Sequence, residues 1–289
     1  MSMKFEAERL WDLPALPTGW EVAATGVGAD STFLTLMADT PFEARRAGQS
    51  SRYRVLKRAG DSLEAFEFVS AGPAAYSVIQ PIDDRNFLLV TTRAYEGMEK
   101  NAHVWGRDGS PVRQFSLGDG IEDAQTSTRS DIWVSYFDEG IFTAGEPGLA
   151  CFDPTGKRVF SFADSVANDD DVPRIDDCYG LNVATADEVW VYYYTAFPLV
   201  KLVNMRLERL WPHIPGLGAH AFAVGEGSVL FAGDYGARTS ITRCFLESGR
   251  IETGHAIGDG KPLEFTRAIG RGERLYLVAN SAVWLLQAD

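Results

Sequence analysis

The sequence predicts an all-β protein, a six-bladed β-propeller whose blades are four-stranded antiparallel sheets. A short run of β-branched and aromatic residues recurs six times along the chain, and each copy follows a polar turn. Hairpin-type turns rich in Asp, Gly and Ser follow most copies, and stretches with helical periodicity are almost absent. With 289 residues, 45% of them hydrophobic, the chain can build a large core, and all-β domains of this length are commonly single.

The recurring run marks the second strand of each predicted blade. Its copies lie at residues 33–36, 87–90, 132–134, 189–191, 229–231 and 275–277. The first residues of successive copies are separated by 54, 45, 57, 40 and 46 positions, close to the roughly 40–50 residues of a four-stranded blade. A strand-like segment precedes each run, and turns such as 107–110 and 153–156 join the two strands that follow it.

The two ends of the chain complete one blade between them. After the sixth run only one further strand-like segment remains, at residues 282–286, so that blade lacks its outer strand. Residues 4–11 are strand-like and precede the first blade, so we expect them to supply the missing strand and to cover the exposed sheet edge. The single predicted domain spans residues 1–289, with blades at 20–69, 76–118, 120–163, 174–216, 218–258 and 260–289 plus 4–11.

Charge and cysteine content narrow the classes of function. A formal net charge of −13 and a pI near 4.8 argue against binding to nucleic acid or to an anionic membrane, because both depend on clustered Lys and Arg. A cation, a metal ion or a basic protein would instead be attracted. The three cysteines, Cys151, Cys178 and Cys244, are far apart and are expected to be buried free thiols. The charged first twelve residues do not resemble a secretory signal, so we expect a cytoplasmic protein.

Four segments resemble a group of uncharacterised bacterial propeller-like proteins: residues 118–125, 132–140, 176–183 and 193–200. The resemblance implies the propeller fold and no particular activity. Residues 180–184 also resemble the Asn-Gly-Leu-Ala segment of the calcium-dependent gluconolactonase and senescence-marker group, which is six-bladed. Cys178 and Tyr179 stand where that group has a metal-binding Asn, so the resemblance does not carry a metal site over.

Propeller topology predicts where a site would form. The loops between consecutive blades and those between the second and third strands of each blade open on one face. The segments that lead into blades carry Glu122, Asp123, Asp176, Asp177, His220 and Glu264. The loops after second strands carry Arg93, Tyr95, Glu96, Asp138, Glu139, Tyr194, Asp234, Tyr235 and Arg238. These residues predict a polar pocket with tyrosine walls, although an acidic protein also has acidic loops that are merely solvated.

Two of these acids and one histidine have specific predicted roles. Asp123 and Asp177 are the last residues of two similar tripeptides, 121–123 and 175–177, in each of which an apolar residue precedes two acids. We therefore expect their side chains to face each other across the central channel. His220 is the one histidine among these loops and therefore the candidate general base. A structural role for His220, bonding the neighbouring blade, is the alternative.

Three functions remain open. The first is a non-catalytic binding propeller whose acidic, aromatic face holds a protein partner or a small polar ligand, with no cofactor. The second is a metal-assisted hydrolase or lyase, in which Asp123, Asp177 and Glu264 hold a divalent cation such as calcium and His220 moves a proton. The third is an inhibitor that neutralises a basic protein, suggested by the net charge of −13.

Overall fold

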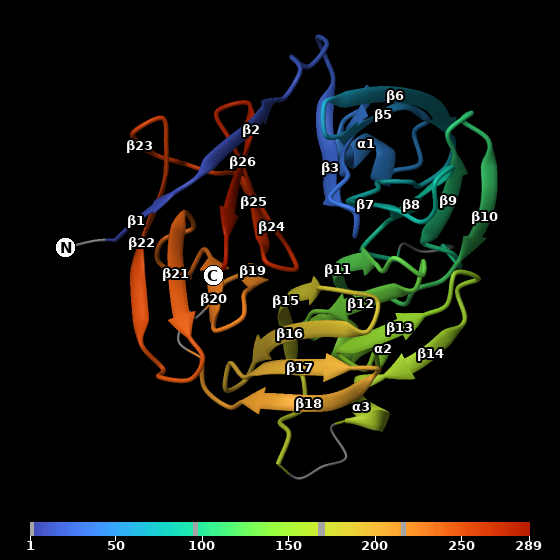
Figure 1. The fold of residues 1–289 in the computed structure, drawn as a ribbon. Coiled ribbons are helices and arrows are strands. Elements are labelled where there is room, and N and C mark those ends of the chain that lie inside the picture. Colours follow the sequence, from blue (N-terminus) through green and yellow to red (C-terminus); the bar gives the residue numbers. More distant parts are fainter. Residues whose placement is uncertain (1–2, 95–97, 167–170, 215–217) are drawn as a thin grey trace. The chain divides into compact units, whose positions relative to one another are not determined.

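The computed structural model describes residues 3–94, 98–166, 171–214 and 218–289, and the chain divides into two compact units. We call Leu16–Asp164 the N-terminal unit, and Ser165–Asp289 together with Met1–Ala15 the C-terminal unit. Each unit contains three β-sheets, coloured in sequence order in Figure 1.

The N-terminal unit consists of three four-stranded sheets in which consecutive strands pair antiparallel. Its strands are β3 (Glu21–Val27), β4 (Phe33–Ala38), β5 (Ser51–Ala59) and β6 (Ser62–Ser70); β7 (Val78–Pro81), β8 (Asn86–Val90), β9 (Ala102–Gly106) and β10 (Pro111–Phe115); and β11 (Ile121–Thr126), β12 (Ile132–Tyr136), β13 (Leu149–Phe152) and β14 (Arg158–Ser161). Short helices α1 (Phe42–Arg46) and α2 (Asp138–Ala144) lie between second and third strands, and α3 (Phe162–Ser165) follows β14. The second strands are buried because they pack between neighbouring layers of apolar side chains.

The C-terminal unit repeats the pattern and adds the N-terminal strands. Its strands are β15 (Asp177–Val183), β16 (Glu188–Tyr194), β17 (Leu199–Val203) and β18 (Arg206–Trp211); β19 (Ala221–Val224), β20 (Ser228–Ala232), β21 (Ser240–Phe245), β22 (Ile251–Gly258) and β23 (Lys261–Pro262); and β24 (Arg267–Arg271), β25 (Arg274–Ala279) and β26 (Ala282–Gln287). Strand β2 (Glu8–Asp12) pairs antiparallel with β26 and completes the last sheet. Strand β1 (Met3–Glu6) pairs parallel with β22, an addition that the sequence did not predict.

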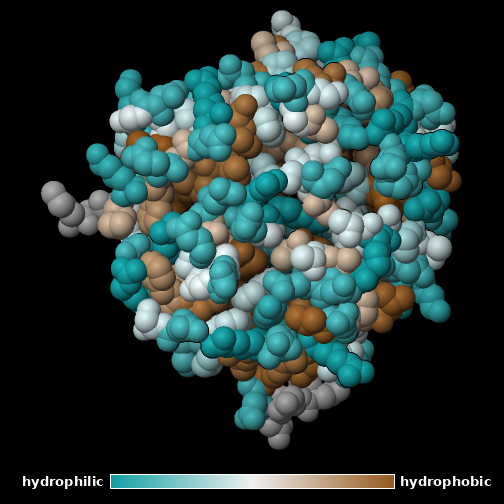
Figure 2. Space-filling model, in the orientation of Figure 1, coloured by the Kyte–Doolittle hydropathy of each residue, from teal (hydrophilic) through white to brown (hydrophobic). Residues whose placement is uncertain are grey.

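Six sheets of this connectivity are the blades of a six-bladed β-propeller. The predicted fold class is therefore confirmed, including the N-terminal strand that completes the last blade. The three cysteines are buried free thiols, as expected. Hydrophilic residues cover most of the face shown in Figure 2, with hydrophobic residues in scattered patches. No helix within the described residues is long and apolar enough to cross a membrane.

The first strands of neighbouring blades approach so closely that glycine is required. A Cβ on Gly270 of β24 would lie 1.8 Å from the carbonyl oxygen of Phe222 in β19, and a Cβ on Gly26 of β3 equally close to that of Ile79 in β7. In the C-terminal unit a buried amide also joins three blades. Asn182 of β15 donates hydrogen bonds to the carbonyls of Phe222 (2.8 Å) and Gly272 (2.9 Å) and accepts one from the Gly272 N–H (2.7 Å). These contacts join β15 to β19 and to the turn between β24 and β25.

Candidate functional site

A pocket of about 600 Å³ opens in the C-terminal unit beside the loop between β20 and β21. We call it the Tyr235 pocket. Its larger side chains come from that loop, from the residue before β19, from the segment before β24 and from the first residue of β24: His220, Asp234, Tyr235, Arg238, Phe265 and Arg267. Its size lies within the range of small-molecule sites.

A β-bulge directs Tyr179 toward two of these side chains. In β15, Cys178 pairs with Tyr193 and Gly180 with Tyr192, which leaves Tyr179 as the extra residue. The Tyr179 ring stacks on His220, with centroids 5.2 Å apart and planes at 18°. The Tyr179 hydroxyl hydrogen-bonds the Tyr235 hydroxyl, and the two rings meet edge to face. Tyr179 therefore fixes the positions of two walls of the pocket.

Tyr235 also borders a second pocket, of about 700 Å³, that is mostly apolar. We call it the apolar pocket. Phe197, Ile214 and Ile251 supply its hydrophobic side chains, and Asp234 and Tyr235 line both pockets. The Tyr235 side chain is 64% exposed, and its ring contacts Phe197 edge to face. Tyr194, the last residue of β16, packs on Phe197 from another direction. The two pockets are thus neighbouring spaces that share one aromatic side chain.

The Asp234 carboxylate accepts hydrogen bonds from residues of its own loop and from the next strand. It accepts hydrogen bonds from the backbone N–H groups of Gly236 (2.7 Å) and Ala237 (2.5 Å) and from the Ser240 hydroxyl (2.8 Å). Partial burial raises its pKa, but these hydrogen bonds outweigh burial and leave the pKa below its ordinary value. Asp234 is therefore an ionised residue that shapes the loop carrying Tyr235.

In the N-terminal unit the predicted site residue Arg93 is held by acidic side chains. Arg93, in the loop after β8, forms an ion pair with Glu139 at the start of α2 and approaches Asp119 at 3.8 Å. Its guanidinium also lies over the Phe137 ring, 5.3 Å from the centroid. Asp138 accepts a hydrogen bond from the Glu139 N–H (2.7 Å). The positive charge of Arg93 is therefore compensated within this loop cluster, which keeps an excess of acidic side chains.

The similar tripeptides that contain Asp123 and Asp177 occupy different positions in their strands. The extra residue of β11 is Glu122, because Ile121 pairs with Tyr136 and Asp123 with Ser135. Relative to the bulge, the equivalent of Asp123 is therefore Gly180, three residues beyond Asp177. Asp123 accepts hydrogen bonds from the Ala124 N–H (2.8 Å) and the Gln125 amide (3.0 Å). The two acids belong to different units, so their facing each other remains a prediction.

The remaining predicted residues lie near the ends of strands. Asp176 precedes β15 and accepts a hydrogen bond from the Thr195 hydroxyl (3.1 Å), and Asp177 is the first residue of β15. Glu264, between β23 and β24, accepts a hydrogen bond from the Thr239 hydroxyl (3.3 Å). Tyr95 and Glu96 lie outside the described residues. Within the described residues, no three or more His, Cys, Asp or Glu side chains are arranged to hold a metal ion.

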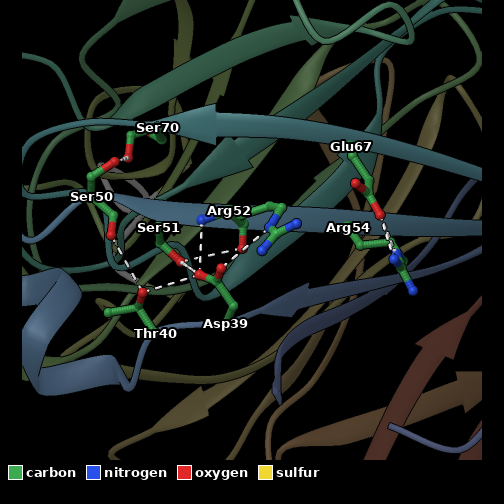
Figure 3. A network of polar contacts seen from close by, with 8 residues as sticks. All are labelled: Asp39, Thr40, Ser50, Ser51, Arg52, Arg54, Glu67 and Ser70. Atoms are coloured by element: carbon green, nitrogen blue, oxygen red, sulfur yellow. Dashed lines mark hydrogen bonds and ion pairs between the residues drawn. The ribbon is translucent and has the colours of Figure 1, made fainter. Parts of the chain in front are cut away.

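A polar network in the first blade shows a carboxylate that serves the fold alone (Figure 3). Asp39 accepts hydrogen bonds from the Thr40 and Ser51 hydroxyls and from the Arg52 N–H, and its other oxygen accepts one from the Arg52 guanidinium. Partial burial raises the pKa of Asp39, but these donors outweigh it and leave the pKa lowered. All donors belong to adjacent strands and turns, so this network joins β4 to β5.

Three residues of the Tyr235 pocket and its support were not predicted from sequence: Tyr179, Phe265 and Arg267. Tyr179 depends on a bulge, which shifts one residue out of the alternating pattern without any sequence signature of its own. Phe265 and Arg267 follow Glu264 by one and three residues. Phe265 lies in the segment that leads into the last blade, and Arg267 is the first residue of β24.

Comparisons with known proteins support the fold. A family model described as the YxzG family matches residues 149–285, a range that contains two of the four segments carrying the resemblance to uncharacterised propeller-like proteins. The predicted resemblance is confirmed to this extent. No curated protein sequence matches the chain significantly.

Solved structures resemble the chain over nearly its full length. Virginiamycin B lyase from Staphylococcus aureus is 12% identical, with a TM-score of 0.58 and coverage of 99% of this chain and 100% of that protein. Hsv2 from Kluyveromyces lactis is 11% identical, with a TM-score of 0.52 and coverage of 93% and 74%. A gluconolactonase from Xanthomonas campestris is 13% identical, with a TM-score of 0.46 and coverage of 97% and 98%. At these identities the first two similarities show a shared fold and carry no activity over.

Proposed function

We propose that the protein is a non-catalytic binding propeller that holds a small polar ligand in the Tyr235 pocket. The observation that carries the proposal is the support given by Tyr179, whose contacts fix both His220 and Tyr235 around a pocket of about 600 Å³. Walls that are already in position reduce the ordering cost of binding.

The chemistry of the lining favours binding over catalysis. Asp234 is engaged by three donors from its own loop, so its lone pairs are poorly placed to accept a proton from a substrate. His220 stacks on Tyr179 and serves as a flat wall. A concave pocket of this size suits a small molecule better than a protein surface, which is the other partner that the sequence predicts.

Thermal unfolding in the presence of small polar compounds tests the proposal. We expect at least one member of a library of sugars, amino acids, carboxylates and phosphates to raise the unfolding temperature. A ligand at 100 times its Kd adds about 2.7 kcal/mol to the free energy of unfolding, equivalent to a few degrees or more.

Tyr235→Ala should abolish that shift. Phe142→Ala is a matched control, because Phe142 in α2 is an aromatic residue of similar exposure, 65% against 64%, in the other unit. A shift that persists in Tyr235→Ala, or a library without any hit, would contradict the proposal.

A further inference from the structure

We infer that the ligand is an amphipathic carboxylic acid, with its carboxylate in the Tyr235 pocket and its apolar body across Tyr235 in the apolar pocket. The inference rests on the proposed function and names the chemical class of the ligand. Three observations carry it: the charges of the first pocket, the exposed hydrophobic residues of the second, and the side chain that the two pockets share.

The lining of the Tyr235 pocket has more basic than acidic residues, whereas the chain as a whole is acidic. The protein carries a net charge of −13, yet the charged residues of this lining are Arg238, Arg267 and the single acid Asp234. The oxygens of Asp234 already accept three hydrogen bonds from its own loop. Guanidinium groups bind carboxylates through paired, charge-assisted hydrogen bonds. An acidic head group therefore fits this pocket.

Arg238 is the cation best placed to receive that head group. It lies in the same loop as Tyr235, and its side chain is exposed, with neither an ion pair nor a hydrogen bond to any residue that the structure describes. Arg93, at the corresponding loop of the second blade, is instead held by Glu139 and Asp119. The Arg238 guanidinium retains its full set of donors for a ligand.

The ionised Asp234 limits the charge of the head group. A carboxylate brings one negative charge, whereas a phosphate monoester brings nearly two at neutral pH. Because Asp234 lines the same pocket, repulsion rises with each added negative charge. We therefore assign a carboxylate rather than a phosphate.

The apolar pocket offers a site for the apolar body of the ligand. Ile251 is 40% exposed at its margin, while Phe197 and Ile214 form its buried part. Covering these side chains with an apolar body would remove hydrophobic surface from water, which favours binding. Tyr235 lines both pockets, so its ring can lie against a ligand that extends from one into the other.

Calorimetric titration with four matched probes tests the inference. They are 4-phenylbutyrate, its neutral amide 4-phenylbutanamide, butyrate without the ring, and 4-phenylbutyl phosphate. We expect 4-phenylbutyrate to bind at least about tenfold more tightly than the amide, because only the acid forms charge-assisted hydrogen bonds with the guanidinium group. Butyrate and the phosphate should each bind more weakly than 4-phenylbutyrate.

Two variants locate the halves of the ligand. Arg238→Gln should reduce the affinity for 4-phenylbutyrate to that for the amide, whereas Ile251→Ser should weaken 4-phenylbutyrate and leave butyrate unchanged. Arg206→Gln is the control, because Arg206 is an exposed arginine at the start of β18, in the same unit but outside both pockets.

The outcomes separate this inference from the proposed function. Equal affinity for acid and amide, tighter binding of the phosphate, or an Arg238→Gln protein that still prefers the acid would overturn the carboxylate assignment. If neutral polar compounds bind through Tyr235 while 4-phenylbutyrate does not, the proposed function stands and the inference fails. If no compound of any class binds, both fail.

Discussion

The two units contain the same three-blade pattern but use their polar residues differently. In the N-terminal unit the loop charges pair with one another, as Arg93 does with Glu139, and Asp39 joins neighbouring strands. In the C-terminal unit the corresponding loops surround two pockets, and one arginine there, Arg238, is without a partner among the described residues. Equivalent loops of one fold thus form ion pairs and hydrogen bonds in one unit and line pockets in the other.

The difference begins with a single bulged residue. The bulge in β11 places Glu122, and the bulge in β15 places Tyr179, at equivalent points of their blades. Because Tyr179 is aromatic, it can stack on His220 and reach the Tyr235 hydroxyl, contacts that need a long flat side chain. The backbone forms a bulge at the same point of the blade in both units, and the type of the bulged residue determines which contacts its side chain can make.

The largest expected effect concerns buried side-chain amides in the first strands of two blades, Asn182 in β15 and Gln80 in β7. Asn182→Ala should lower the free energy of unfolding by about 3 kcal/mol, because it removes three hydrogen bonds and leaves the Gly272 N–H of the β24–β25 turn without its acceptor, although the Gly272 carbonyl still accepts from the Val224 N–H. Urea unfolding followed by tryptophan fluorescence measures the change.

Gln80→Ala is the matched variant in the N-terminal unit. Gln80 of β7 is also buried, but it accepts only long hydrogen bonds from the N–H (3.4 Å) and hydroxyl (3.5 Å) of Thr126. We expect a loss of about 1 kcal/mol. Equal losses in the two variants would remove this part of the contrast between the units.

The next effect separates paired from unpaired loop arginines. Arg93→Gln should lower the free energy of unfolding by up to about 1 kcal/mol, the usual contribution of an exposed ion pair. Arg238→Gln should change it by less than about 0.5 kcal/mol, since no interaction with a described residue is lost. The same urea titrations apply, and added salt should reduce the Arg93 effect alone. A clear destabilisation by Arg238→Gln would show that this residue serves the fold.

The fold was predictable because its signals are local and repeated. Each second strand is a run of apolar and aromatic residues preceded by turn residues, and the strand missing from the last blade identified the role of the N-terminal segment. The site was only partly predictable. Topology placed His220, Asp234, Tyr235 and Arg238 in neighbouring loops, and these four line one pocket.

What the sequence could not supply was register. The tripeptides that end in Asp123 and Asp177 are similar in sequence. Counted from the bulge in each strand, however, their positions differ by three residues. Bulges arise from packing between whole strands, so the residue they redirect is visible only once the pairing is known. For the same reason the parallel pairing of β1 with β22 carried no signal in the local pattern.

The smallest expected effect is a pH dependence that originates in the N-terminal unit. Burial lowers the pKa of His103 in β9 below its ordinary value, although a hydrogen bond to the Lys100 carbonyl opposes this. A carbonyl can only accept, so Nε2 carries the proton, and Nδ1 accepts from the Tyr76 hydroxyl at 2.5 Å. Burial also raises the pKa of Tyr76 to about 12, so that hydroxyl remains a donor. The folded state therefore favours neutral His103.

The sign of the pH effect follows from this preference. Below pH about 6.5, the ordinary pKa of histidine, the unfolded chain binds a proton at residue 103 that the folded chain resists. The contribution of neutral His103 is thus complete above that pH and is lost as the pH falls through the lowered pKa of the folded state. In urea unfolding between pH 7.5 and 5, His103→Gln should lose less stability than the wild type, because its amide can still hydrogen-bond but cannot be protonated. Wild-type and variant curves that remain parallel over this range would show that the Tyr76–His103 hydrogen bond tolerates protonation of His103.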